Sequence, residues 1–225
     1  MTVLHLADEG EAADLAAFLS RLIHYDRSAA VRLQAAGTAL AVFGRPASFE
    51  VLAIRAVRLA KPYENGLDVT LDVTVSAGEL LETVDESGAT AAVPGAVTGP
   101  PWAGVLPPRG GWRPESGLPA PDGLRAMVGA AVAEFRSRTQ ELAPEGRTRA
   151  ELDAIGREIW SRTVGDTPLP VRAVHAAQSV GFLRPGTPAD LFSSGAWLRL
   201  RTPFGSIAVR RAGVGAAALG VSVRR

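Results

Sequence analysis

The sequence predicts an α+β protein: an N-terminal helix over a mostly antiparallel sheet, then a helical unit that ends in a winged-helix-like β-hairpin. Two observations support this prediction. Residues 67–75, LDVTLDVTV, alternate strictly between apolar and polar side chains, as a half-buried strand requires. Residues 122–180 have the apolar spacing of helices, and two short strand-like segments joined by a four-residue turn follow them.

Composition limits the class of protein. The 225 residues are 47% hydrophobic and 21% charged, as in ordinary soluble globular domains, and they include no cysteine. Disulfides, thiolate metal sites and a cysteine nucleophile are therefore excluded. The opening residues, MTVLHLADEGEAADL, lack the basic start and apolar run of a signal peptide, and no apolar run is long enough to span a bilayer. We therefore expect a cytoplasmic, soluble protein with no membrane partner.

Residues 1–93 are expected to form an α+β domain. Asp8 and Glu11 have the spacing of a capping box, which predicts a helix that continues to about Asp26. The expected strands cover residues 30–35, 38–44, 49–60 and 67–75, with an edge strand at 89–93. The sequence SAGE after the alternating strand has the spacing of a second capping box and predicts a short helix there.

The alternating strand is expected to pack against the first helix. Its apolar residues Val69, Leu71 and Val73 would face Phe18 and Leu22, because the apolar stripe of that helix has no other apolar face to cover. The polar residues of the strand would then lie on the opposite face of the sheet.

The order of elements in this half resembles one domain of a DNA sliding clamp: a helix, strands, and a short helix after a long alternating strand. The resemblance covers under half of the chain and concerns architecture alone. The runs FLSRLIHYDRSAAVRLQAAGTALAVFG, VLPPRGGW and AAQSVGFL also look like uncharacterised proteins of high-GC actinobacteria, such as streptomycetes. That second resemblance implies a source and no activity.

Residues 94–121 join the two halves and are rich in proline and glycine without a hydrophobic period, which is typical of a linker. Trp102 and Trp112 nevertheless lie in this stretch, and disordered linkers rarely contain two large apolar rings. The stretch also lacks the PxxP pattern of an SH3 ligand. We therefore expect an ordered connector that touches both halves, with its tryptophans mostly buried.

Residues 122–225 are expected to form three helices followed by a hairpin, which is the order of elements in a winged-helix domain. The expected elements are helices over 122–142, 149–163 and 168–180 and strands over 197–201 and 206–211. Residues 1–120 carry a net charge of −5 and residues 121–225 a net charge of +6. This asymmetry favours two units and an anionic partner for the second.

The third helix and the hairpin carry the residues that would contact DNA. Arg172, His175 and Ser179 fall at helical spacing with Gln178 beside them, and such side chains can reach base edges in a major groove. The hairpin residues expected to meet phosphates are Arg199, Arg201, Arg210 and Arg211. The alternative is a buried, alanine-rich helix and a hairpin whose outer face is merely polar.

No catalytic, cofactor or metal site is predicted. The three histidines are far apart in the sequence and lack metal-ligand spacing, and Asp68 and Asp72 are expected only to keep one strand face hydrated. The run GVGAAA at 213–218 imitates a dinucleotide fingerprint, but too few residues follow it for a βαβ unit. The leading hypothesis is a non-enzymatic protein that binds a macromolecular partner. A winged-helix DNA-binding protein is the second hypothesis, and an enzyme with an unrecognised site is the third.

Overall fold

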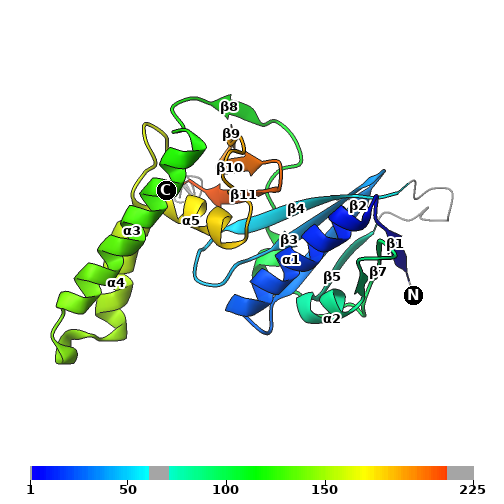
Figure 1. Ribbon diagram of the computed structural model, residues 1–225, viewed down its shortest axis with the longest axis horizontal. Helices are drawn as coiled ribbons and strands as arrows, with labels where there is room; N and C mark the ends of the chain where they lie inside the picture. The colour runs from blue at the N-terminus through cyan, green and yellow to red at the C-terminus, as the bar shows by residue number, and fades with distance from the viewer. Residues whose placement is uncertain (1, 61–70, 212–225) are drawn as a thin grey trace, which may run out of the picture.

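Strands from both halves of the chain form one large antiparallel sheet. The computed structural model describes residues 2–60 and 71–211, and in this part the sheet has eight strands in the order β5-β2-β3-β4-β11-β10-β9-β8 (Figure 1). Its strands are β2 (Ala30–Ala36), β3 (Ala39–Gly44), β4 (Leu52–Arg58), β5 (Asp72–Ser76), β8 (Arg113–Glu115), β9 (Asp190–Ser194), β10 (Trp197–Thr202) and β11 (Gly205–Arg210). The predicted α+β class is confirmed.

Helices cover one face of this sheet, which we call the inner face. The helices are α1 (Glu9–Tyr25), α2 (Ala77–Glu82), α3 (Pro121–Glu141), α4 (Arg149–Ser161) and α5 (Val171–Ser179), with 3₁₀ turns at Pro101–Gly104 and Pro144–Gly146. In Figure 1, α1 lies along β2–β4, and α3 and α4 form a helical hairpin that projects from the sheet. A small second sheet has the order β1 (Val3–His5), β7 (Thr90–Ala92), β6 (Val84–Asp85).

The first helix begins where the capping box predicts. The Asp8 carboxylate accepts a hydrogen bond from the Glu11 N–H at 2.8 Å, which satisfies one of the N–H groups that lack a partner within the helix. The stripe that includes Phe18 and Leu22 is fully buried in the main core. Leu71 is partly buried against the same core.

Of the alternating stretch, the structure describes residues 71–75, and β5 begins at Asp72. Val73 pairs with Leu33 on the inner face, and Val75 is fully buried there. Residues 67–70, with Val69 and Asp68, lie outside the described residues, as does the run at 213–218.

One prediction about the strands is wrong. The segment at 89–93 was expected at a sheet edge, but β7 is the middle strand of the small sheet, between β1 and β6. Its two partners are only three and two residues long, so neither has a hydrophobic period that a sequence pattern could reveal.

The predicted C-terminal hairpin forms as β10 and β11, and it continues the sheet of the N-terminal half. Ile207 of β11 pairs with Ala53 of β4, and β10 also pairs with β9. Phe18 of α1 stacks on Phe182, which follows α5, with ring centroids 5.4 Å apart. The two halves therefore share a sheet and a core.

A buried ion pair reinforces this junction. Arg55 of β4 is 5% exposed, and its guanidinium binds the carboxylates of Glu11 and Asp14 at 3.0 and 3.1 Å. The other terminal nitrogen of Arg55 donates to the Phe204 carbonyl at 2.8 Å, in the turn between β10 and β11. One side chain thus connects α1, β4 and the hairpin.

The connector packs on the outer face of the sheet. Trp102 and Leu106 pack on a small apolar cluster of the outer face, whose buried members are Phe43, Leu52, Ile54 and Ala208. Arg32 of β2 donates a hydrogen bond to the Ala103 carbonyl, and β8 pairs with β9 at the sheet edge. Both Trp102 and Trp112 are partly buried.

The projecting helical hairpin is held by a cluster of ion pairs. Arg162 binds Glu134 and Glu158 at 2.6 and 2.9 Å, and Arg138 binds Glu158 at 2.8 Å. The hydrogen bond from Arg138, followed by that from Arg162, lowers the pKa of Glu158 from 4.5 to about 2.

We expect this cluster to stabilise the hairpin above about pH 4.5 and to lose that effect as the pH falls towards 2. The reason is that the folded state binds the Glu158 proton less readily than the unfolded state does. The measurement is thermal unfolding followed by circular dichroism across this range. Glu158→Gln should unfold with a weaker pH dependence than the wild-type protein, whereas Glu145→Gln, at an exposed position between the helices, should match the wild type.

Candidate functional site

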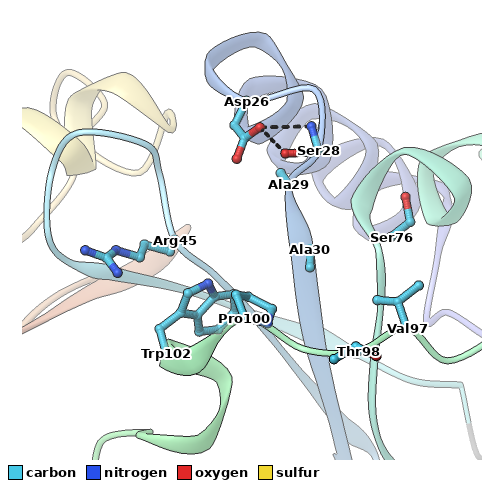
Figure 2. A pocket seen from close by; sticks show the side chains of 10 residues that line it. All are labelled: Asp26, Ser28, Ala29, Ala30, Arg45, Ser76, Val97, Thr98, Pro100 and Trp102. Carbon is cyan, nitrogen blue, oxygen red and sulfur yellow. Dashed lines mark hydrogen bonds between the residues drawn. The ribbon is translucent and has the colours of Figure 1, made fainter.

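Two adjoining hollows form a trough on the outer face, beside the connector. The first has a volume of about 410 Å³, and its floor includes Ala30 at the start of β2 (Figure 2). Figure 2 shows Asp26 and Ser28 at one end of this hollow and Trp102 at the other. The remaining lining residues are Ala29, Arg45, Ser76, Val97, Thr98 and Pro100.

The second hollow has a volume of about 260 Å³ and shares Arg45 and Trp102 with the first. Its other lining residues are Glu50, Val51, Leu52, Val105, Trp197, Ala208, Val209 and Arg210. We refer to the two hollows together as the outer trough. Leu52 and Ala208 belong to the buried outer-face cluster, so the second hollow has an apolar floor between two tryptophans.

Strand alternation explains why these side chains meet. Along β10, Leu198 and Leu200 are buried on the inner face, so Trp197 points to the outer face. Trp197 pairs with Arg210 of β11, and the Arg210 guanidinium lies 5.2 Å from the Trp197 ring centroid. This distance allows a cation–π contact at the rim of the trough.

The loop between β3 and β4 supplies the other charged residues of the rim. Ser48 and Glu50 have positive φ angles of 70° and 52°, which non-glycine residues rarely adopt. This backbone places Arg45 and Glu50 at the trough, while Phe49 lies 5.0 Å from the His175 ring. The predicted strand at 49–60 starts later, at Leu52, because this loop occupies its first residues.

Within the described residues, neither Arg45 nor Arg210 forms an ion pair. Glu50 lies 3.9 Å from Arg172, at the limit of an ion pair. At the far end of the trough, the Asp26 carboxylate accepts hydrogen bonds from the Ser28 N–H and hydroxyl at 2.9 and 2.7 Å (Figure 2). The second hollow therefore presents two arginines and one weakly paired carboxylate.

The candidate DNA contacts on α5 lie over the inner face. His175 sits between Phe49 and Trp160, with ring centroids at 5.0 and 4.7 Å, and burial lowers its pKa. Gln178 is exposed, and Ser179 is partly buried. The helix buries its alanines and valines in the main core, so much of its surface is occupied.

Three of the four candidate arginines on the hairpin bind side chains of this protein, and Arg210 has no ion pair within the described residues. Arg201 binds Asp190 at 3.1 Å, Arg211 binds Glu115 at 2.8 Å, and Arg199 donates to the Ser206 hydroxyl at 2.9 Å. Burial also lowers the pKa of Arg199.

The structure brings Arg210 to the second hollow, and Arg172 of α5 lies 3.9 Å from Glu50, which lines the same hollow. Arg199, Arg201 and Arg210 alternate with buried inner-face residues and so belong to the outer face, opposite α5. Arg45, Glu50 and Trp197 were missed as site residues. One signal was available: in WLRLR, Trp197 occupies a polar-face position.

We expect the neutral form of His175 to contribute to stability above pH 6.5, its ordinary pKa, and that contribution to decrease as the pH falls below 6.5. The folded state resists protonation of this buried ring, whereas the unfolded state does not. Urea unfolding between about pH 8 and pH 5 measures the effect. His175→Phe should flatten the pH dependence of the free energy of unfolding, and His5→Gln, at an exposed position in β1, should leave it unchanged.

Two family models match the chain, and the boundary between the two matches lies in the connector. Residues 1–104 match the family model described as Domain of unknown function (DUF8010), and residues 107–214 match Domain of unknown function (DUF8185). No curated protein matches the chain. Within residues 2–60 and 71–211, no helix is both long and apolar enough to cross a membrane, and no cluster of three or more histidine or acidic side chains could hold a metal ion. The two halves that share the sheet are thus each similar to a separate family of unknown function.

Proposed function

We propose that this protein is a non-enzymatic module that binds a segment of another protein in the outer trough. The observation that carries the proposal is the convergence of Trp102 and Trp197 with Arg45 and Arg210 around one apolar hollow. Tryptophan and arginine dominate the binding energy of protein interfaces, and they do so in pockets at the centre of the contact.

Exposed apolar side chains mark the same place. Val97 and Val105 are 39% and 45% exposed, and they line the first and the second hollow, respectively. Both belong to the connector, whose neighbouring residues pack on the sheet. Apolar groups that stay exposed beside a concave surface are typical of an interaction site.

The experiment is selection of a random heptapeptide phage library on the full chain. Recovered peptides should bind Val105→Asp about tenfold more weakly or worse, because an aspartate beside the apolar hollow must be desolvated. The control is Val3→Asp, at a position that is 42% exposed in β1 and outside the trough. Equal binding to both variants, or the absence of any recovered peptide, would contradict the proposal.

DNA binding is the second candidate function. The net charge of +6 in residues 121–225 and the unpaired Arg210 favour it. We expect Arg210→Ala to weaken binding to every sequence and to reduce the salt slope by about one, and Arg172→Ala to weaken it selectively. Genomic fragments titrated at low salt test this, and no shift at about tens of micromolar protein would remove the DNA hypothesis.

We also infer a cytoplasmic location and an actinobacterial source. The cysteine-free composition is compatible with a reducing compartment. The single lysine among 24 basic residues reflects the arginine codons of a high-GC genome.

A further inference from the structure

We propose that the partner segment is an extended acidic peptide, in which one apolar side chain fills the hollow between Trp102 and Trp197. A neighbouring Asp or Glu side chain of the peptide binds Arg45 and Arg210. This inference rests on the proposed function and adds the chemistry of the ligand.

The size and lining of the second hollow favour an apolar side chain. Its volume of about 260 Å³ is below the range of about 300–1,000 Å³ that is usual for cofactor and drug-sized ligands. Leu52 and Ala208 form its floor, and Trp102, Val105 and Trp197 stand around it. A leucine- or phenylalanine-sized group would lose its contact with water there without displacing any ion pair of the described residues.

The charges at the rim favour a carboxylate. Of the three ionisable residues that line the second hollow, Glu50 already has Arg172 within 3.9 Å, whereas Arg45 and Arg210 have no ion pair within residues 2–60 and 71–211. The charge left without a partner is therefore positive. A guanidinium binds a carboxylate through two parallel hydrogen bonds, which fixes both position and direction.

Ion pairs of three other arginines favour a peptide over a nucleic acid strand. Arg32 binds Asp72 at 2.7 Å, and Arg201 and Arg211 are bound to Asp190 and Glu115. A nucleic acid strand requires a series of cations along its phosphates, and these arginines would first have to leave their carboxylates. A peptide with one or two acidic residues requires only the pair at the rim.

The first hollow provides a path for the rest of the peptide. It begins at Arg45 and Trp102, which it shares with the second hollow, and continues past the hydroxyls of Ser28 and Thr98 (Figure 2). Hydroxyls both donate and accept hydrogen bonds, so they can pair with the N–H and C=O groups of an extended backbone.

The test uses the recovered library peptides, synthesised with a fluorescein label and an amidated C-terminus. Each is also made with its acidic residues changed to the amides, and again with its apolar residue changed to serine. We expect either change to weaken binding by about tenfold. Arg45→Gln and Arg210→Gln should remove the preference for the acidic peptide over its amide form, and Arg157→Gln, at an exposed position in α4, should retain it.

The outcomes distinguish peptide binding in the outer trough from the preference for an acidic peptide. The inference is supported if Arg45→Gln and Arg210→Gln lose the preference for the acidic peptide over its amide form while Arg157→Gln retains it. Peptides that lose binding to Val105→Asp but bind equally well in acidic and amide form would overturn the inference and leave the proposed function standing. Peptides that bind Val105→Asp as well as the wild type would overturn both.

Discussion

Replacement of Arg55 by alanine is expected to lower the free energy of unfolding by about 3–5 kcal/mol. The change removes one of the two arginine partners of the buried Glu11 carboxylate and leaves the Phe204 carbonyl without its donor. It also removes one of two links between α1 and the turn between β10 and β11; the other is Arg184, which binds Asp14 and lies over the Phe204 ring. Urea denaturation followed by circular dichroism measures the loss.

Arg58 provides the matched control, since it also binds Glu11, at 2.8 Å, but its side chain is 69% exposed. Arg58→Ala should cause a much smaller loss, because water screens an exposed ion pair. A second variant, Glu11→Leu with Arg55→Met, should recover part of the stability that Arg55→Ala loses, since it removes both buried charges together. Equal free energies of unfolding for Arg55→Ala and Arg58→Ala would show that the contribution of Arg55 to stability does not come from its burial.

Phe18→Ala is expected to cost about 3–5 kcal/mol, the usual range for a fully buried phenylalanine. Because Phe18 stacks on Phe182 of the other half, the loss should appear in one cooperative transition rather than in the N-terminal half alone. The measurement is urea unfolding followed by far-ultraviolet circular dichroism and by tryptophan fluorescence.

Trp160 lies among the helices of the second half, and Trp102 and Trp197 pack on the sheet that both halves share, so fluorescence reports on these two places and circular dichroism on the whole fold. Coincident curves that shift together in Phe18→Ala are the expected result. Tyr25→Ala, at a 45% exposed position in the same helix, should shift both curves only slightly. Two separate transitions, with only one of them moved by Phe18→Ala, would show that the halves unfold independently.

Local signals in the sequence predicted most elements of this fold. The capping boxes at Asp8 and Ser76 each start a helix, because a cap needs only residues three apart in the chain. The hairpin of β10 and β11 is likewise predicted by alternation around a short turn. Such signals do not depend on the rest of the fold.

Long-range pairing could not be read in the same way. Nothing local to Ala53 or Ile207 indicates that β4 and β11 are partners, since both strands bury residues on both faces and would suit many neighbours. The candidate site depends on this pairing. Arg45 and Trp102 from the first half and Trp197 from the second meet only after β4 and β11 join.

The most direct test of the outer trough as a binding site is ¹⁹F NMR of the full chain with fluorinated tryptophan. The chain has four tryptophans, so four resonances are expected, each assigned with one Trp→Phe variant. When the tightest-binding library peptide is added, the resonances of Trp102 and Trp197 should shift, and that of Trp160, which contacts Phe135 and His175 among the helices, should stay in place. A spectrum in which Trp160 shifts while Trp102 and Trp197 do not would place the binding site elsewhere and contradict the account.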